Sequence, residues 1–166
     1  RIAQIYEGTN GIQAMDLVGR KLGMNGGRAT QAYLALVNGA LAEAKGDPRL
    51  AVIAGPLEKA LGDLQAATMW LLQNGMAKPD NAGAGATAYL HLMGIVALGH
   101  MWLLMAKASH EALDGGADGS VDRDFYEAKL ITARYYAGRY FPDARALRAK
   151  LEDGCEAMMA MPVAAF

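Results

Sequence analysis

The sequence predicts an all-α protein, an up-down helical bundle of about four long helices preceded by a short helix. Ala, Leu, Met, Lys and Glu dominate, while runs of β-branched residues and strict apolar–polar alternation are nearly absent. Apolar residues instead recur every three or four positions in long segments that Gly and Pro separate. Amphipathic segments joined by short breaks are typical of an antiparallel bundle.

The first full helix is expected to begin near Gly11, with Thr9 or Asn10 as its N-cap. Gly23 is placed to end it, and a loop is expected over residues 25–27. Its apolar face is predicted from helical spacing to hold Ile12, Met15, Val18 and Leu22.

Two longer helices follow, from about Ala29 to Lys45 and from about Pro48 to Gly75. Asp47 is the expected cap of the second, with Pro48 as its first helical residue. Pro56 is expected to kink or restart that helix. The predicted inward residues are Tyr33, Leu36, Val37, Ala40, Leu41 and Ala44 in the first, and Leu57, Leu61, Leu64, Thr68, Leu71 and Leu72 in the second.

The second half is predicted as a loop over Lys78–Gly85, an apolar helix from about Ala86 to Leu113, a polar connection and a last long helix from about Arg123. Pro142 interrupts this last helix, and an exposed continuation is expected to Glu156. The tail from Met158 to Phe166 is expected to be frayed or disordered. Helix glycines are expected to mark close contacts or bends: Gly39, Gly62, Gly94, Gly99 and Gly138.

The apolar stretch Tyr89–Ala108 has the length of a membrane span. It carries His91, His100 and Lys107, and no basic cluster flanks it. We therefore favour a buried helix of a bundle over a membrane span.

The composition excludes some classes of protein. With 166 residues, 53% of them hydrophobic and 20% charged, the chain is expected to be globular. A net charge of -1 argues against a nucleic-acid partner. The single cysteine, Cys155, can form no internal disulfide, which fits a reducing compartment, and we expect a cytoplasmic location. The chain opens on Arg1 within a helical pattern, which we interpret as the C-terminal piece of a larger protein.

Glu7 is the candidate catalytic residue. It could be a capping or surface glutamate, but three neighbouring features favour chemistry. Gly8 permits close approach of a substrate, and the helix that Thr9 and Asn10 cap presents free amides to the same space. Tyr6 can shield the carboxylate from water, which raises its proton affinity and suits it to act as a general base.

These residues resemble a known active-site signature. Ile5-Tyr6-Glu7-Gly8-Thr9, with Ile12-Gln13 beyond, is similar to the signature of the acyl-CoA dehydrogenases. The wider string IYEGTNGIQAMDLVGRKL resembles a subgroup of larger members, among them the 3-methylmercaptopropionyl-CoA dehydrogenases, which carry an extra C-terminal helical domain. The later segments LQAATMWLLQNG and FYEAKLITARYYAGRYFP are similar to that domain. The resemblance divides the chain into residues 1–27, the end of the catalytic helical domain, and residues 28–166, the extra bundle.

The resemblance implies a mechanism and a set of site residues. Glu7 would take the α-proton of an acyl-CoA thioester while FAD accepts the β-hydrogen as hydride, giving a trans-2-enoyl-CoA. Gly8 would lie against the substrate, and Thr9, Asn10 and Gly11 beside the FAD. Most family members have Gln at the place of Gly11, so a side-chain contact with the flavin is missing here, while Gln13 matches a second family glutamine.

The resemblance also implies partners. They are an acyl-CoA substrate, electron-transferring flavoprotein as the electron acceptor, and a homodimer or homotetramer. Most of the flavin and thioester pockets would be built upstream of Arg1, so we expect the isolated chain to bind no FAD and to be inactive. The alternative is a helical packing or oligomerisation module without chemistry, because residues from about 29 onward carry no convincing catalytic set.

The remaining candidates have structural interpretations. His91, His100 and His110 form no metal-binding pattern, and we expect hydrogen-bonded core or edge histidines. Cys155 is expected on an exposed, polar helix. Two further groups of side chains could bind ligands but are more simply explained by packing. The first group is expected in the core: Met93, Met101, Met105, Trp70 and Trp102. The second is an aromatic cluster that is expected to pack on the missing domain or on a second subunit: Tyr135, Tyr136, Tyr140 and Phe141.

Overall fold

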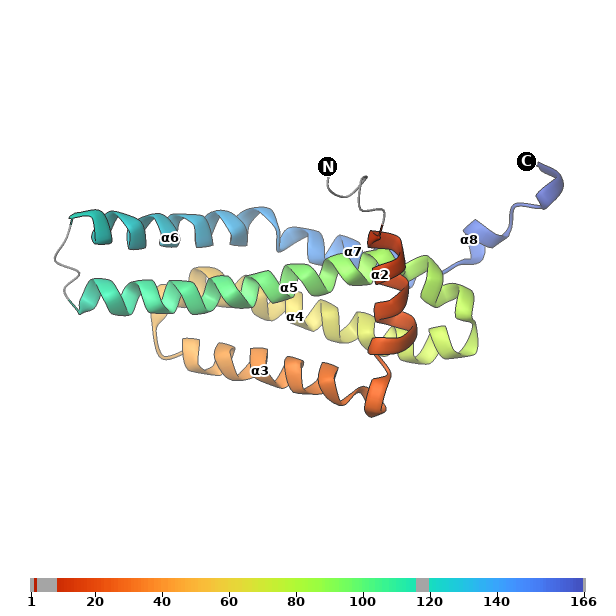
Figure 1. Cartoon of the computed structure of the whole chain (residues 1–166), viewed down its shortest axis with the longest axis horizontal. Helices are drawn as coiled ribbons and strands as arrows, with labels where there is room; N and C mark the ends of the chain where they lie inside the picture. Colours follow the sequence, from red (N-terminus) through yellow and green to blue (C-terminus); the bar gives the residue numbers. More distant parts are fainter. Residues whose placement is uncertain (1, 3–8, 116–119, 166) are drawn as a thin grey trace.

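The computed structural model describes residues 2, 9–115 and 120–165. These residues form helices and no strand, so the predicted all-α bundle is confirmed. Four rods run along the long axis of the molecule in Figure 1: α3 (Arg28–Ala44), α4 (Ala51–Trp70), α5 (Pro79–Asp114), and α6 (Ser120–Arg139) continued by α7 (Pro142–Glu152). The short helix α2 (Asn10–Asp16) crosses one end of this bundle.

The first helix, α2, keeps α-helical hydrogen bonding only over Asn10–Asp16. α2 passes into a π-helical turn, Leu17–Lys21, and then into a 3₁₀ turn, Met24–Gly27. Asn25, Gly26 and Gly27 all have positive φ (53°, 68° and 75°), which reverses the chain before α3 and confirms the predicted loop.

The apolar face of α2 differs from the predicted one. Ile12 and Met15 are 69% and 50% exposed, while Ala14 is fully buried. The π-helical turn adds a residue to one turn of the helix, so positions before and after it no longer share the face that a regular spacing of 3.6 residues predicts.

α3 and α4 follow the predicted bounds closely. Asp47 caps a 3₁₀ turn, Pro48–Leu50, by accepting the Arg49 N–H at 2.9 Å, as expected. α4 runs without interruption through Pro56, so the predicted restart is wrong, and a π-helical turn, Leu71–Gly75, continues it. Two predicted inward residues are exposed, Leu36 and Leu72, and the others are buried or partly buried.

The predicted loop over Lys78–Gly85 is wrong, because α5 begins at Pro79. Tertiary contacts hold these first turns despite their poor helix propensity. The Asn81 side chain donates to the Asn74 carbonyl at 3.3 Å and accepts the Cys155 N–H at 3.1 Å. A Cβ on Gly85 would meet Leu151 Cγ at 2.9 Å, so the glycine allows α7 to approach α5.

The last part of the chain is again helical on either side of Pro142, as predicted. α6 begins at Ser120, three residues before the predicted start. After α7 the chain forms a short helix, α8 (Glu156–Met159), and a 3₁₀ turn, Val163–Ala165, with exposed side chains throughout residues 158–165. The predicted tail is therefore exposed but contains two short turns of helix.

The core lies between α3, α4, α5, α6 and α7. Its largest fully buried side chains are Tyr89, Ile53, Leu57, Leu64, Leu92, Leu103 and Leu151. Among the glycines predicted to mark close contacts, only Gly99 does so: a Cβ there would clash with the Phe141 ring, whereas Gly39, Gly62, Gly94 and Gly138 have open space. The close-contact alternative is thus wrong for four of the five glycines, and a bend at those four stays a prediction.

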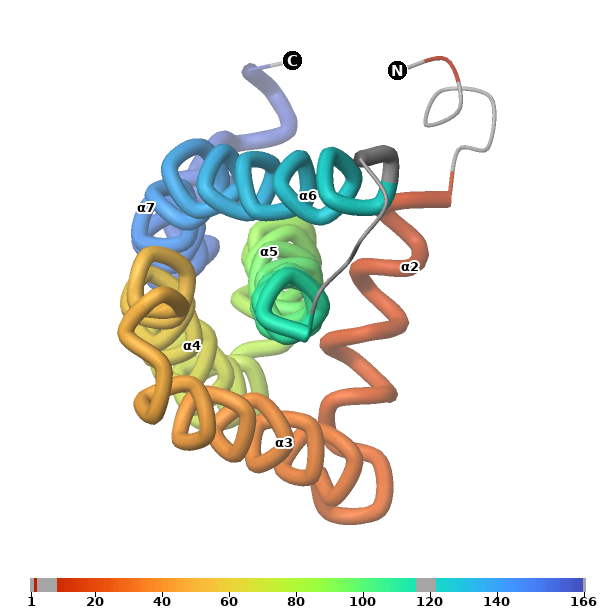
Figure 2. Tube along the Cα trace, turned by 90° about the vertical axis from the view of Figure 1, so that its left-hand side faces the viewer, coloured from red at the N-terminus to blue at the C-terminus, as the bar shows by residue number. Residues whose placement is uncertain are grey.

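α5 is the central helix of the bundle. Figure 2 shows it with α6 above, α4 and α7 on one side and α3 below, while α2 crosses the far end of the remaining side. By length and composition α5 could cross a membrane, and 33% of its most apolar 18-residue stretch is buried inside the described chain. The core candidates on or near it are mixed: Trp70, Met93 and Trp102 pack against the core, while Met101 is exposed.

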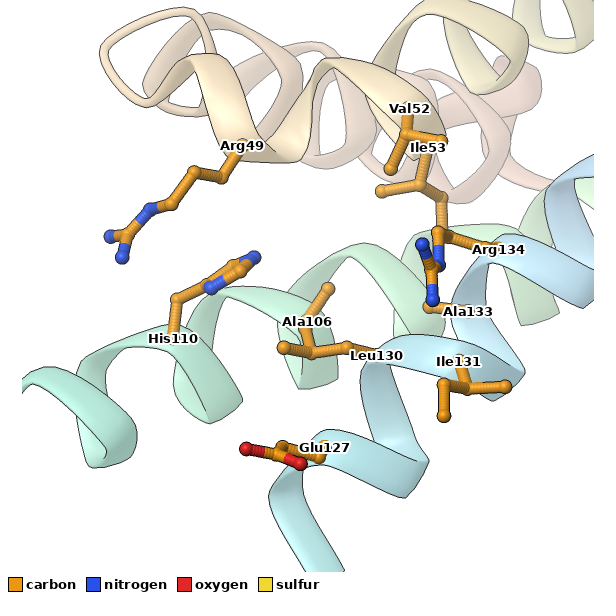
Figure 3. Close-up of a pocket in the computed structure, with 10 residues that line it drawn as sticks. All are labelled: Arg49, Val52, Ile53, Ala106, His110, Glu127, Leu130, Ile131, Ala133 and Arg134. Carbon is orange, nitrogen blue, oxygen red and sulfur yellow. The ribbon is translucent and has the colours of Figure 1, made fainter. Parts of the chain in front are cut away.

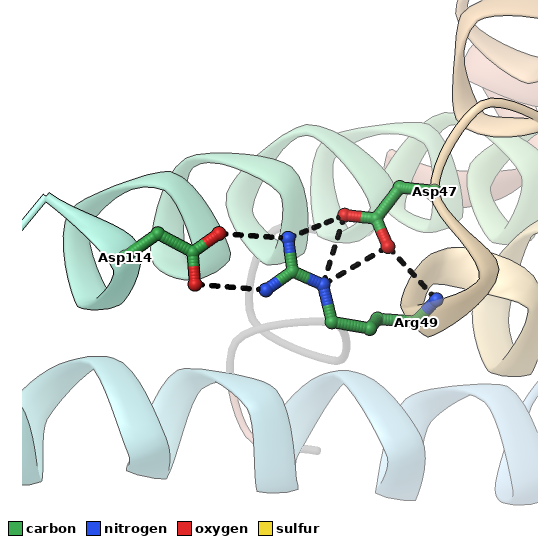
Figure 4. A network of polar contacts seen from close by, with 3 residues as sticks. All are labelled: Asp47, Arg49 and Asp114. Carbon is green, nitrogen blue, oxygen red and sulfur yellow. Dashed lines mark hydrogen bonds and ion pairs between the residues drawn. The ribbon is translucent and has the colours of Figure 1, made fainter.

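Arg49 joins two loops at the other end of the bundle (Figure 4). Its guanidinium donates to both carboxylate oxygens of Asp47, at 2.7–3.0 Å, and to those of Asp114 at 2.9 and 3.0 Å. The start of α4 is thereby connected to the C-terminal end of α5 by a forked, charge-assisted contact.

Candidate functional site

The predicted site lies at the entrance of α2. Glu7 and Gly8, the predicted base and substrate-contact residue, lie outside the described residues. Thr9, Asn10 and Gly11 are described, and they form the N-cap and first turn of α2. The Thr9 carbonyl accepts the Gln13 N–H at 2.8 Å, so the helical hydrogen bonds begin at this residue.

The start of α2 is chemically open. The Thr9 side chain makes no capping hydrogen bond, which corrects the expectation of a side-chain cap. Asn10, Gly11 and Gln13 are exposed, and no atom of another described residue outside the α2 backbone lies within 4 Å of the position that a Cβ on Gly11 would take. The first amides of a helix lack partners within it, so these N–H groups can donate to a bound group that carries negative charge.

This geometry fits one edge of a flavin and not a complete flavin site. Donors at a helix N-terminus and a glycine without neighbours leave room for a planar cofactor beside Thr9, Asn10 and Gly11. A cofactor of that size is normally enclosed on most sides, and these three residues of one helix end offer a single side. The rest of the enclosure must come from other residues.

Two cationic side chains, Arg20 and Lys21, keep the Asp16 carboxyl at the end of α2 ionised. Asp16 is held by Arg20 Nε at 2.6 Å and by Lys21 Nζ at 3.0 Å. These contacts, Arg20 first, lower the pKa of the Asp16 carboxyl to about 2. Asp16 therefore stays ionised at neutral pH and is a poor general base.

The histidines do not form a site together. His91 is exposed and His100 is buried, 2% exposed. His100 Nδ1 and the neighbouring Tyr33 hydroxyl have no hydrogen-bond partner among the described residues, which corrects the expectation of a hydrogen-bonded core histidine. Burial lowers the pKa of His100. No cluster of His, Cys, Asp and Glu suited to a metal occurs in the described part of the chain.

Cys155 is not on an exposed helix, as the sequence had suggested. It is buried, precedes α8 as its N-cap residue, and its backbone N–H donates to Asn81 Oδ1 at 3.1 Å. Burial against the start of α5 makes it a packing residue.

Half of the aromatic cluster belongs to the core of this chain. Tyr136 and Phe141 are buried, and the Tyr136 hydroxyl donates to the Ile95 carbonyl at 2.9 Å. Burial raises the pKa of Tyr136 to about 12. The expected packing on a missing domain or subunit is therefore wrong for these two residues, while Tyr135 and Tyr140 remain exposed.

A cavity of about 370 Å³ lies between the start of α4, the end of α5 and α6 (Figure 3). Its lining is apolar, with four charged or titratable side chains: Arg49, His110, Glu127 and Arg134. Arg49 is occupied by Asp47 and Asp114, and Glu127 pairs with Arg123 at 2.9 Å. Among the described contacts no hydrogen bond joins His110 to Glu127, so an acid–base pair is not assembled here.

The sequence pattern did not predict this cavity. Its residues come from three helices that are far apart in the chain, and no spacing within one helix brings them together. The cavity can hold a small apolar group beside a cation, and no Ser, Thr, Cys or Lys is among its lining residues.

The comparisons with known proteins match the bundle. The family model "acetyl-CoA dehydrogenase C-terminal like" matches residues 29–162. The chain is 32% identical over 160 residues to the 3-methylmercaptopropionyl-CoA dehydrogenase of Ruegeria pomeroyi, covering 96% of this chain and 26% of that protein. It is 34% identical over 178 residues to the broad-specificity linear acyl-CoA dehydrogenase FadE5 of Mycobacterium tuberculosis, covering 100% of this chain and 28% of that protein.

A butyryl-CoA dehydrogenase of Syntrophomonas wolfei is 29% identical over 149 residues, 86% of this chain and 23% of that protein. The chain thus spans about a quarter of the length of the curated relatives it matches, and it matches their C-terminal part. The chain belongs to the acetyl-CoA dehydrogenase C-terminal-like family, which matches its residues 29–162.

Proposed function

We propose that the whole protein is an FAD-dependent acyl-CoA dehydrogenase and that Glu7 is its general base. The observation that carries this proposal is the position of the Tyr6-Glu7-Gly8-Thr9-Asn10 segment immediately before α2, in a chain whose bundle matches the C-terminal domain of such enzymes. The relatives are named for different acyl groups, from butyryl and 3-methylmercaptopropionyl to a broad range of linear acyl chains, so the proposal names only the substrate class, an acyl-CoA thioester.

The reaction is an α,β-dehydrogenation. The Glu7 carboxylate takes the α-proton of the thioester and becomes a carboxylic acid. The β-hydrogen would leave with its electron pair as hydride, for which FAD bound by the whole protein would supply the acceptor, and the product would be a trans-2-enoyl-CoA. Developing negative charge on the thioester oxygen requires a donor, and in this family the backbone N–H at the position of Glu7 is one.

The residues after Glu7 take the roles that their position suggests. Gly8 lies against the substrate, because a residue without a side chain allows a ligand to approach the backbone. Thr9, Asn10 and Gly11 contact the flavin, and the exposed amides and open space at the start of α2 support this. Residues 1–27 then belong to the catalytic domain and residues 28–166 to the extra bundle, in keeping with a family model that begins at residue 29.

We further propose that the 166-residue chain alone binds no FAD and is inactive. The start of α2 offers one side of a flavin site, and the remaining sides must come from the rest of the protein. The purified chain should therefore be colourless. A flavin absorbance spectrum that persists through purification would contradict this.

The decisive experiment uses the whole protein with Glu7→Gln. Without the base, turnover should fall by about 10²–10⁴-fold, while the flavin spectrum and thermal midpoint stay unchanged. Glu43→Gln is the matched control, because Glu43 is exposed on α3 and pairs only with Lys107 among the described contacts. Near-normal turnover of the Glu7 variant would refute the assignment.

The second candidate function concerns the bundle. Residues 28–166 would serve packing or subunit contact, and exposed large apolar residues on α5 and α6 favour this. The whole enzyme would be a cytoplasmic homodimer or homotetramer that passes electrons to electron-transferring flavoprotein. Deleting residues 28–166 should change its subunit number or stability, and an enzyme unchanged in both would contradict a packing role.

A further inference from the structure

One face of the second half of α5 is apolar and uncovered within the described chain. Leu98, Met101 and Leu104 are 57%, 44% and 41% exposed. They follow one another at a spacing of three residues, which places them on one side of the helix, and Met105 and Ala108 continue that side. We call these five residues the α5 face.

The α5 face lies between α3 and α6, on the side of α5 that these two helices leave open in Figure 2. We use the word trough for this strip of surface, with the α5 face as its floor and α3 and α6 as its walls. α3 lies along one edge, where the Tyr33 and His100 rings are 6.2 Å apart and Lys107 Nζ contacts Glu43 at 2.9 Å. α6 lies along the other edge, where the Trp102 and Tyr136 rings are 6.4 Å apart.

Apolar side chains continue from the floor onto both walls. Leu36 follows Tyr33 by three residues on α3 and is 60% exposed. On α6 Phe125 is 55% exposed, and Lys129 lies over both its ring and that of Trp102. A contiguous apolar surface of this kind marks a contact with another protein surface.

α2 already covers the other end of this side of α5. Gly83 precedes Met101 by 18 residues, five turns of an α-helix, so the two lie on the same side of α5. A Cβ on Gly83 would lie 3.9 Å from Met15 Cε of α2, and Ala14 beside it is fully buried. Figure 2 shows α2 across this side of the bundle.

We propose that the part of the protein upstream of Arg1 packs into this trough and covers the α5 face. This inference rests on the proposed function, in which the chain is one part of a longer enzyme. The curated relatives are about four times as long as this chain, and the upstream chain would join α2 on the open side of the bundle. The occupant is an aliphatic surface, because the floor carries no charge and both walls present apolar side chains.

The charged edges favour a protein occupant over a lipid one. The Lys107–Glu43 pair lies along the α3 edge, and Lys129 lies on the α6 wall. Inserting these charges into a bilayer would be costly, whereas a protein surface can leave them at the rim.

Photo-crosslinking in the whole protein tests the proposal. A benzophenone side chain replaces Met101 in one sample and Ala42 in the other. Ala42 is an exposed alanine of α3 on the side opposite Tyr33 and Leu36, so it is the matched control. We expect position 101 to link to peptides upstream of Arg1 within the same chain, and position 42 to give no such product.

Mixing isotopically light and heavy protein separates the other outcomes. Links between light and heavy chains from position 101 would show that a second copy fills the trough. Links to lipid in the presence of vesicles would show a membrane contact. Either result, or no product at position 101, would overturn the proposal.

A stability measurement provides a second readout. Leu104→Asp should lower the thermal midpoint of the whole protein by several degrees, because a buried carboxylate has no partner in an apolar contact. The same change in the 166-residue chain should lower its midpoint by less, because Leu104 is already 41% exposed there, and Ala42→Asp should have little effect in either protein. Equal effects of Leu104→Asp and Ala42→Asp on the whole protein would overturn the proposal.

These readouts do not depend on catalysis. Upstream cross-links together with full turnover of the Glu7 variant would refute the proposed base and keep the interface. Loss of turnover in the Glu7 variant, without upstream cross-links from position 101, would support the proposed base and refute the interface.

Discussion

The α2 segment and the bundle differ in what holds them in place. α2 buries one residue of its own, Ala14, and leaves Ile12 and Met15 exposed. α4 alone buries Ile53, Leu57 and several further side chains against the other long helices. The described part of the candidate site, Thr9 to Gly11, therefore lies on a segment with less buried surface than the long helices of the bundle.

This difference separates the two kinds of mutational effect. Substitutions in the bundle should act on folding, because its residues are enclosed by apolar neighbours. Substitutions at the start of α2 should act on chemistry in the whole protein and hardly on the stability of this chain.

The largest expected effect compares a core leucine with a residue of α2. Leu92→Ala removes a side chain that is fully buried, and it should lower the free energy of unfolding by about 2–5 kcal/mol. Met15→Ala, at a half-exposed position, should change it by less than about 0.5 kcal/mol. Urea unfolding of both variants, followed by circular dichroism at 222 nm, measures the difference. Equal losses would show that α2 is an integral part of the core.

Two glycines of α5 sharpen the comparison within the bundle. A Cβ on Gly99 would clash with the Phe141 ring, so Gly99→Ala should cost about 1–3 kcal/mol through overpacking. Gly94 is in open space on the same helix, and Gly94→Ala should stabilise by about 0.5–1 kcal/mol through helix propensity. Thermal unfolding of the two variants gives opposite signs if α5 and α7 meet as described. A stabilising Gly99→Ala would contradict that contact.

Local patterns predicted the elements whose causes are local. The Asp47-Pro48 cap and the ends of α3 were predictable, because a side chain within two residues of the backbone N–H sets the cap. The start of α5 was not, because Asn81 and Gly85 are helical owing to contacts with Cys155 and Leu151, about seventy residues away.

The site shows the same division. The helix start at Thr9 to Gly11 followed from the sequence pattern, as did the openness that suits a ligand. The exposed position of Met15 did not, because the π-helical turn after Asp16 shifts the register of α2. The buried state of Tyr136 likewise depends on its contact with Ile95 on another helix, which no local spacing encodes.

The two regions should also respond to pH in different ranges, and His100 reports on the bundle. Burial lowers its pKa below the ordinary 6.5, so the unfolded chain binds this proton more readily than the folded one. Stability should therefore rise with pH and fall as the pH drops below about 6.5, by at most ~1.4 kcal/mol per pH unit.

Urea unfolding between pH 7 and pH 5 measures this slope. His100→Gln should flatten it, since no group at position 100 then titrates. His91→Gln is the control, because His91 is exposed on the same helix. A slope that survives His100→Gln would assign the pH dependence to other groups.

The smallest effect concerns Asp16 in the α2 segment. Arg20 first and Lys21 second lower its pKa from the ordinary 3.8 to about 2. The folded-state pKa is depressed, so the contribution of this carboxylate to α2 is present above pH 4 and is lost as the pH falls toward 2. Because the contacts are exposed, the free energy involved is small and salt should reduce it.

Carboxyl-carbon NMR titration follows Asp16 directly. Arg20→Ala should return its pKa most of the way to 3.8, and Lys21→Ala should move it less. Asp47 in the bundle, whose pKa Arg49 lowers to about 2, should be unaffected by either change. A pKa of Asp16 that stays near 2 without Arg20 would mean that the α2 segment is held by a contact other than this fork, and the contrast with the bundle would weaken accordingly.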